Sequence, residues 1–258
     1  MIIKVLCENT SADNSIGCEH GLSLYIETLG KKILFDMGQT ELFSINAEKM
    51  GVDLKDVDLA FLSHGHYDHG GGLETFLSIN SKAKVYINEN AFGDYYNGKE
   101  KYIGLNKALK ENGRIIFTSD EYEVSTDMKL FTMNNKSKKF DLGSFGLNKK
   151  LNGEFYPDDF LHEHYLLINE KGKNILISGC SHKGIMDITE FFKPEVLIGG
   201  FHFSKLPLDG KLMEYALFLE SKGTEFYTCH CTGLEQHEFM KKYMTKLNYI
   251  KSGQTIEI

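Results

Sequence analysis

The sequence lacks the features that define several large protein classes. No apolar run approaches the roughly 18 residues that a membrane-spanning helix needs. An excess of positive charge is also absent, because the formal net charge is −7. We therefore expect neither nucleic acid nor an anionic membrane as a partner. There is no linker, low-complexity tract or short-period repeat, and no glycine-rich phosphate loop of the Walker type.

The cysteines and the first residues indicate the compartment. The five cysteines are an odd number, and Cys229 and Cys231 flank a histidine instead of following a disulfide-type spacing. The apolar residues 1–6 are too few for a secretory signal, and Glu8 follows them closely. We expect a reduced, cytoplasmic protein that acts on a small molecule, either as a monomer or as a homodimer.

The length and the hydrophobic fraction of 41% predict one domain over residues 1–258. Runs of strands interspersed with amphipathic helices indicate an α/β (α+β) fold, in which two sheets pack together with helices outside. Residues 91–112 and 134–150 show little periodicity, so both segments are candidate lids.

The elements follow from apolar patterning and turn residues. Strands are expected at residues 2–7, 22–28, 32–36, 59–63, 84–88, 114–118, 128–133, 164–168, 174–178, 196–198 and 225–227. Helices are expected at residues 40–50 and 73–79, after Gly184, and around residues 212–219 and 240–247, with one or two helical turns at 105–110.

A dense group of potential metal ligands follows the apolar residues 59–62. His64, His66, Asp68 and His69 lie within six positions, beside several glycines. Imidazole and carboxylate ligands suit zinc, and also manganese or iron. Four ligands so close in sequence would crowd one ion. We therefore predict two divalent metal ions, most simply zinc, with further ligands from elsewhere in the chain.

The pattern His64-x-His66-x-Asp68-His69 resembles the signature of the metallo-β-lactamase fold superfamily. Further stretches resemble one branch of it, named after the archaeal dihydropterin-ribofuranosylaminobenzene phosphate synthases of methanopterin biosynthesis. These stretches are Glu19–Ser23, Leu34–Gln39, Ser178–Gly184, Gly199–His202 and His230–Gly233. The resemblance implies a four-layer αβ/βα sandwich of two mixed sheets with helices outside.

The second half of the chain offers the missing ligands. His182 follows the apolar residues 175–177, in the same kind of context as His64, and the resemblance also implies a ligand at His230. On this interpretation one ion is held by His64, His66 and His182, and the other by Asp68, His69 and His230. Many superfamily members carry a metal-bridging aspartate where this chain has Cys180. Its thiol is either a soft metal ligand or a small buried group.

Other side chains are expected to support the site. Asp36 is expected to orient a ligand histidine by accepting its N–H. His202 is interpreted either as a catalytic group that polarises a substrate oxygen or as a packed histidine. His20 is as compatible with a place at the site as with one outside it. At most part of the group at residues 162–164 is expected near the metals.

Two features bear on the substrate. The basic segment 134–150, with Lys136, Lys138 and Lys139, is either a solvated loop or a lid that attracts an anionic substrate. Tyr95, in an aromatic stretch, either lines a pocket for a flat substrate or belongs to the core.

The predicted chemistry is metal-dependent hydrolysis of an ester, lactone, thioester or phosphoester. Two ions about 3.5–4 Å apart lower the pKa of a shared water and hold a hydroxide near neutral pH. Asp68 would ligate and position that hydroxide as a catalytic residue. The resemblance implies a rival activity, a pterin-related synthase of the methanopterin type. The residues are also compatible with a non-catalytic ligand sensor and with a redox diiron enzyme.

Overall fold

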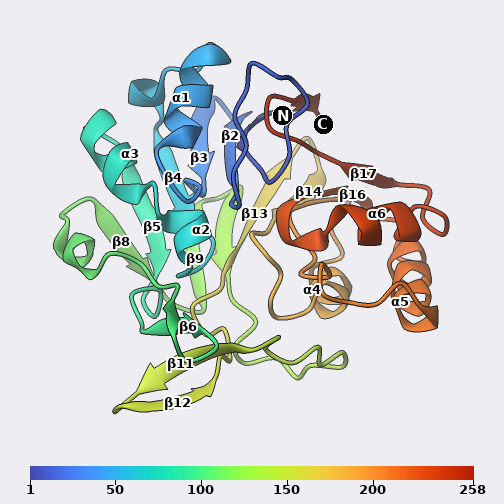
Figure 1. Cartoon of the computed structure of the whole chain (residues 1–258). Coiled ribbons are helices and arrows are strands. Elements are labelled where there is room, and N and C mark those ends of the chain that lie inside the picture. Colours follow the sequence, from blue (N-terminus) through green and yellow to red (C-terminus); the bar gives the residue numbers. More distant parts are fainter. The chain divides into compact units, whose positions relative to one another are not determined.

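The computed structural model describes all 258 residues, which form two compact units (Figure 1). The first unit contains residues 1–119, 146–163 and 251–258, and the second unit contains residues 120–145 and 164–250. Each unit is therefore built from separate stretches of the chain. One domain over residues 1–258 stays a prediction.

A mixed seven-stranded sheet forms the centre of the first unit, in the order β18-β1-β2-β3-β4-β5-β8. Pairing is antiparallel from β18 to β3 and parallel from β3 to β8. The strands are β1 (Ile2–Cys7), β2 (Ser23–Thr28), β3 (Lys31–Phe35), β4 (Leu59–Leu62), β5 (Lys84–Asn88), β8 (Ile115–Thr118) and β18 (Thr255–Glu257).

Helices α1 (Leu42–Lys49) and α3 (Leu73–Ile79) lie beside this sheet (Figure 1). Their buried faces pack against the strands in one apolar cluster, which includes Phe43 and Phe76 from the helices and Leu62 from β4. Two short helical segments, η1 (Leu54–Asp56) and α2 (Tyr67–Gly70), complete this part of the first unit. The expected strands and helices up to residue 88 are present with small shifts at their ends.

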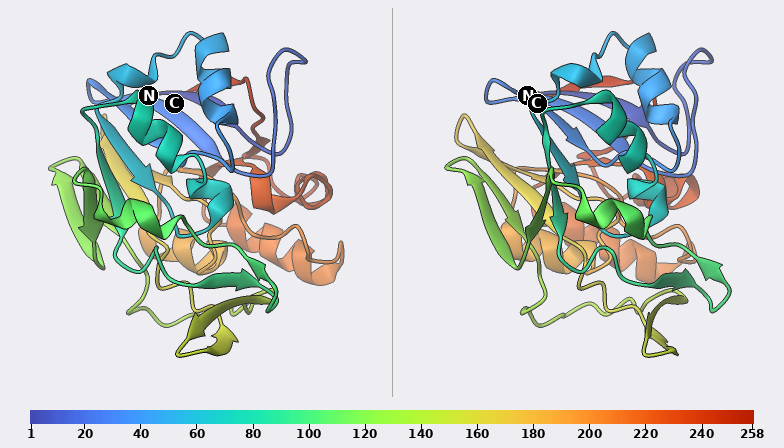
Figure 2. Two further views of the ribbon diagram at one scale, coloured as in Figure 1. Left: turned by 60° about the vertical axis from the view of Figure 1, so that its left-hand side comes forward. Right: turned by 90° about the vertical axis from the view of Figure 1, so that its left-hand side faces the viewer.

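Residues 91–112, which showed little periodicity in the sequence, contain two strands of a second, smaller sheet of the first unit. Its order is β12-β11-β6-β7, and Figure 2 shows its strands side by side, β6 in green and β11 and β12 in yellow-green. The bounds are β6 (Tyr95–Asn97), β7 (Lys101–Tyr102), β11 (Leu147–Leu151) and β12 (Glu154–Pro157), with η2 (Lys107–Glu111) after β7. β6 pairs with β11 from a distant stretch, so local periodicity does not reveal it.

The second unit also contains a mixed seven-stranded sheet, in the order β17-β16-β15-β14-β13-β10-β9. The strands β14 to β17 are parallel, whereas β13, β10 and β9 are antiparallel. The bounds are β9 (Glu121–Ser125), β10 (Met128–Phe131), β13 (Tyr165–Glu170), β14 (Lys173–Ile177), β15 (Val196–Ile198), β16 (Glu225–Thr228) and β17 (Leu247–Tyr249).

Three helices pack on the sheet of the second unit: α4 (Ile185–Phe192), α5 (Gly210–Glu220) and α6 (Leu234–Met240). The helix expected around residues 240–247 is wrong, because α6 ends at Met240 and Leu247 begins β17. The end of α6, a turn and a strand bury Met240, Met244 and Leu247 as fully as one helix would, so their apolar spacing did not distinguish the two arrangements. No helix of the protein is both long and apolar enough to cross a membrane.

Candidate metal centre

The first unit gathers its polar groups at the carboxyl ends of neighbouring parallel strands. Asp36 follows β3 directly, and Ser63 and His64 follow β4, its parallel neighbour. Loops at the carboxyl ends of parallel strands meet at one edge of a sheet, which is where ligands bind in open α/β sheets. Asp36, Ser63, His64 and His69 are completely buried at this edge.

Asp36 connects three of these groups through its carboxylate. It accepts hydrogen bonds from the backbone N–H of Ser63 (2.7 Å), from Ser63 Oγ (2.8 Å) and from His69 Nδ1 (2.6 Å). Because the Ser63 hydroxyl donates to Asp36, its oxygen accepts from His64 Nδ1 at 2.8 Å. Both imidazoles then carry their proton on Nδ1 and would coordinate a metal through Nε2. This geometry fits the orienting role expected of Asp36.

His66 is oriented by a different carboxylate. Its Nε2 lies 3.5 Å from Asp158 Oδ2, which leaves metal coordination to Nδ1. The same oxygen accepts from His162 Nε2 at 3.1 Å, while His162 Nδ1 accepts from the backbone N–H of Gly65 at 2.9 Å. His162 therefore supports the backbone between the two ligand histidines, and its ring nitrogens are both engaged.

The charge state of Asp158 agrees with this arrangement. Burial alone would raise the pKa of Asp158, but the charge and hydrogen bond of His162, together with those of His66, hold that pKa well below its usual range. The side chains of Asp158 and His162 are both completely buried. A buried carboxylate is stable in such a place only where donors surround it.

Asp68 lies at the exposed side of this group, on the short helix α2. Its Oδ2 is 3.2 Å from His20 Nε2 and 3.9 Å from His69 Nε2. The loop that carries His20 is tightly packed on Asp68, because a Cβ on Gly21 would stand 2.4 Å from the Asp68 carbonyl oxygen. His20 thus lies at the site, with its side chain 58% exposed.

The donors of the first unit fit a divalent transition metal. Three buried imidazoles and one carboxylate form the set of nitrogen and oxygen donors that zinc, manganese and iron accept. The ring nitrogens that would not bind the metal are held by other polar groups, as is usual at metal sites. Asp36 and Asp158 also supply negative charge behind the ligands, which compensates the positive charge of an ion.

The second unit repeats this arrangement at the carboxyl ends of β14, β15 and β16. Cys180 and His182 follow β14, His202 follows β15, and His230 follows β16. These three strands are parallel neighbours, so their loops meet at one edge. The ligand atoms of Cys180, His182 and His202 lie within 4.8 Å of one another, and so do those of Cys180, His230 and Cys231. Cys180 belongs to both groups.

Cys231 is held between the loops of the second unit. Its Sγ accepts from the backbone N–H of His202 at 3.2 Å and lies 3.5 Å from the Cys180 carbonyl oxygen. Burial raises the pKa of Cys231, but hydrogen bonds with the side chains of Cys180 and His202 and the charges of His230 and His202 outweigh it and hold the pKa well below its usual range.

Several of these loops adopt the left-handed backbone conformation at residues other than glycine. The φ angles are 58° at Asp36, 59° at Ser181, 56° at His202 and 50° at His230. Each such residue costs about 1 kcal/mol or more, and such strain concentrates at functional sites. All four lie at the carboxyl ends of strands, next to the candidate ligands.

The structure shows which contacts the predicted substrate residues make. In the basic segment, Lys139 Nζ lies 2.7 Å from Glu190 of α4, and Lys136 Nζ lies 4.6 Å from the Phe191 ring. Lys138 is exposed. Tyr95 is 5% exposed and donates its hydroxyl to the Asn90 carbonyl at 2.6 Å, while its ring packs on His162. Tyr95 is thus a core residue behind His66.

Sequence reasoning did not identify two residues that contact the candidate ligands. Asp158 lies in a loop after β12 with no motif around it, so nothing in the sequence signals its contact with His66. Cys231 does carry a signal, because it follows the predicted ligand His230 and stands in a stretch that resembles the superfamily branch.

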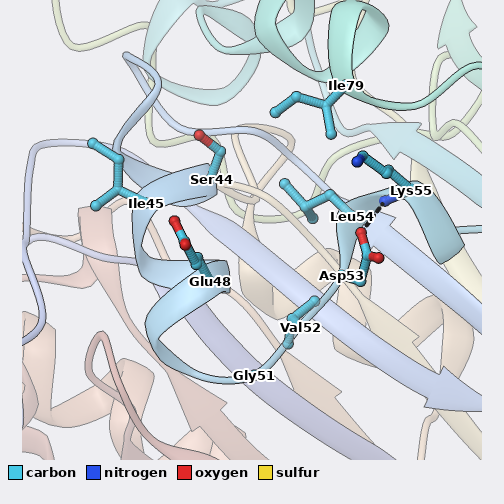
Figure 3. Close-up of a pocket in the computed structure, with 9 residues that line it drawn as sticks. All are labelled: Ser44, Ile45, Glu48, Gly51, Val52, Asp53, Leu54, Lys55 and Ile79. Carbon is cyan, nitrogen blue, oxygen red and sulfur yellow. Dashed lines mark hydrogen bonds between the residues drawn. The ribbon is translucent and has the colours of Figure 1, made fainter.

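A surface pocket elsewhere in the first unit lacks such chemistry. It lies among α1, η1 and the end of α3 and contains no histidine or cysteine (Figure 3). Its lining residues include Ser44, Glu48, Asp53 and Ile79. The candidate centre therefore stays with the strand-end loops.

Comparison with known proteins identifies the family of the chain. A family model described as the metallo-beta-lactamase superfamily matches residues 16–209. The uncharacterized protein MJ0448 of Methanocaldococcus jannaschii is 29% identical, over 97% of this chain and 95% of its own length. A 7,8-dihydropterin-6-methyl-4-(beta-D-ribofuranosyl)-aminobenzene-5'-phosphate synthase of the same organism is 28% identical, over 99% of this chain and 96% of its own length.

A solved structure is similar over the whole chain. Tm1679, described as a metal-dependent hydrolase of the beta-lactamase superfamily, has a TM-score of 0.84 and 31% sequence identity, covering 100% of this chain and 99% of that chain. This match and the two mixed sheets with helices confirm the fold class predicted from the sequence. The chain therefore belongs to the metallo-beta-lactamase superfamily.

Proposed function

We propose that this protein is a metal-dependent hydrolase that cleaves a small ester, lactone, thioester or phosphoester. The observation that carries the proposal is the buried group of His64, His66 and His69, whose outer ring nitrogens are held by Asp36, Ser63 and Asp158. Such fixed imidazoles are the usual partners of a catalytic metal. The similarity to Tm1679 supports the same class of reaction.

The ligand set of the proposal is the one predicted from the sequence. His64, His66 and His182 hold one divalent ion, and Asp68, His69 and His230 hold the other. Zinc is the first choice, and manganese and iron are the next. When bound, the ions supply a water of lowered pKa and a positive charge that stabilises the developing negative charge of the substrate.

The protein's own residues have separate roles in this proposal. Asp68, partly exposed beside His20, positions the attacking water. His202 polarises a substrate oxygen, and its ring is held against His182 and Phe145 at centroid distances of 4.3 Å and 5.0 Å. Asp36 and Asp158 keep the ligand imidazoles in single orientations, so that little reorganisation is needed when the metal binds.

A second candidate function is a synthase that joins a pterin to an aminobenzene ribosyl phosphate. The 28% identity to the M. jannaschii synthase over nearly the whole of both chains favours it. We rank hydrolysis first, because a synthase must also hold two large substrates and the sequence contains no Walker-type phosphate loop.

The test combines metal analysis with two reaction panels. Elemental analysis should find up to two transition-metal ions per chain after reconstitution with zinc, manganese or iron. The metal-loaded protein is then incubated with phosphodiesters, lactones and thioesters, and separately with a dihydropterin pyrophosphate plus the aminobenzene ribosyl phosphate. We expect cleavage in the first panel, abolished by Asp68→Ala. Condensed product in the second panel without cleavage in the first would establish the synthase, and absence of any metal would refute both.

A further inference from the structure

The exposed side of the ligand group in the first unit is lined by three polar side chains from three segments. His20 contacts Asp68, Tyr67 precedes Asp68 on α2, and Lys101 extends from β7. Lys101 is exposed and Tyr67 is half-buried. Asp68 has the most exposed side chain among the candidate ligands of the first unit, at 12%.

Lys101 is fixed in this position by Tyr67. Its ammonium donates to the Tyr67 hydroxyl at 3.0 Å and lies 5.2 Å from the centre of the Tyr67 ring. The backbone N–H of Tyr67 donates to the Ile103 carbonyl at 2.8 Å, which ties the segment after β7 to α2. The hydrogen bond to Tyr67 is the main cause that raises the pKa of Lys101, and the charge of Asp68 adds to it. The ammonium is therefore held against the residue that precedes Asp68 on α2.

The partner of Lys101 distinguishes it from Lys107 and Lys139. Its hydrogen bond goes to a neutral phenol, so its positive charge is not compensated in an ion pair. By contrast, Lys107 pairs with Asp94 at 2.6 Å, and Lys139 pairs with Glu190 at 2.7 Å. An uncompensated ammonium beside a metal ligand attracts anionic groups of a substrate.

We infer that Lys101 and Tyr67 form an anion-binding site that takes a carboxylate or phosphate group of the substrate. The Lys101 ammonium and the Tyr67 hydroxyl donate to the anionic oxygens, and this contact orients the scissile bond toward Asp68. The inference rests on the proposed function, because it names the substrate class of the same site. On this inference Lys101 and Tyr67, and not the basic segment 134–150, mainly determine the preference for an anionic substrate.

The experiment measures binding of three probes of similar size to the metal-loaded protein by titration calorimetry at low ionic strength. The probes are phenylphosphonate, benzoate and the neutral benzyl alcohol. The test variants are Lys101→Gln, Tyr67→Phe and the triple variant Lys136→Ser/Lys138→Ser/Lys139→Ser. The control variant is Lys99→Gln. Lys99 is an exposed lysine of the same hairpin, so its variant removes an equal charge nearby.

We expect Lys101→Gln to raise the Kd of at least one anionic probe about tenfold, since a hydrogen bond to a charged group is lost. Tyr67→Phe should raise the same Kd less, and Lys99→Gln and the Kd of benzyl alcohol should not change. The anionic probe that loses affinity identifies phosphate or carboxylate as the ligand group. Equal metal content in all variants shows that the ligands are intact.

Two results would overturn the inference. In the first, Lys101→Gln binds both anionic probes with Kd values within twofold of those of the wild type. The other is loss of affinity in the triple variant or in Lys99→Gln that equals the loss in Lys101→Gln. The experiment measures binding and not cleavage, so it separates this inference from the proposed function. If the protein cleaves no ester but Lys101→Gln loses affinity for an anionic probe, the proposed hydrolysis is contradicted and the anion site is supported.

Discussion

At the scale of single residues, each candidate ligand histidine of the first unit has a carboxylate that fixes the orientation of its ring. Asp36 acts on His69 directly and on His64 through Ser63, whereas Asp158 acts on His66. The two carboxylates therefore select different metal-binding nitrogens, Nε2 for His64 and His69 and Nδ1 for His66. A metal held by these rings has a defined geometry before the substrate arrives.

Replacement of Asp158 by Asn tests this role. The change removes the negative charge that holds His66 and His162, while the size of the side chain is conserved. We expect metal affinity to fall about 10- to 100-fold, as is typical when the residue behind a ligand is changed. Competition with a chromogenic chelator measures the affinity.

Asp159→Asn is the matched control for Asp158→Asn. Asp159 is the next residue, its side chain is 45% exposed, and it pairs with Lys149 on the surface. This variant should bind metal as the wild type does. Equal metal affinity of the Asp158 and Asp159 variants would show that Asp158 does not orient His66.

The candidate ligand histidines could be proposed from the sequence because the signal was local. An apolar strand followed by His64-x-His66-x-Asp68-His69 identifies both the strand end and the chemistry. Asp36 was predicted for the same reason, since it ends another apolar strand. Asp158 and the pair of Lys101 with Tyr67 could not be predicted, because each depends on a contact between segments that the sequence does not place together.

At the scale of elements, the backbone at the strand ends is packed too closely to accept side chains. A Cβ on Gly65, between two ligand histidines, would stand 2.1 Å from the Ala91 carbonyl oxygen and 2.8 Å from its carbon. These are backbone atoms, so β4 and the segment after β5 would have to separate. Gly65 thus sets the distance between two segments of the first unit.

Gly65→Ala should lower the free energy of unfolding by about 2 kcal/mol or more, because overpacking of a closely packed site has a cost of this size. Gly113→Ala is the control, since a Cβ at Gly113 meets no atom within 4 Å. That variant should be as stable as the wild type or slightly more stable. Urea unfolding of both proteins measures the difference, and similar midpoints would contradict the close packing at Gly65.

Except for the helix expected around residues 240–247, the expected elements with a clear apolar pattern are present, and three edge strands were not predicted. β9, β12 and β18 are edge strands in which no residue is fully buried. Their residues form strands because a neighbouring strand offers hydrogen bonds, and not because of a buried face. Such pairing is a tertiary effect that local propensity does not contain.

At the scale of the whole molecule, metal binding should contribute to stability. The candidate ligands are assembled only in the folded chain, so a metal at 100 times its Kd stabilises the protein by about 2.7 kcal/mol. For a chain of this size that corresponds to a shift in Tm of about 5–10 °C. Differential scanning calorimetry with and without a chelator checks this.

The His64→Ala variant separates specific from general effects of the chelator. It lacks one buried ligand, so its Tm should respond to the chelator less than the Tm of the wild type. An equal response in both proteins would show that the stabilising metal is not bound by His64.

The pairing of β1 with β18 has a consequence for the order in which the protein can be completed during synthesis. The strand β1 pairs through Ile2, Ile3 and Lys4 with Glu257, Ile256 and Thr255, so two partners in one sheet are separated by almost the entire chain. A nascent chain that has reached residue 250 already contains all of the second unit, but the first unit then lacks one edge strand. The unpaired backbone of β1 can meanwhile pair with another chain. Aggregation during translation should therefore begin at β1.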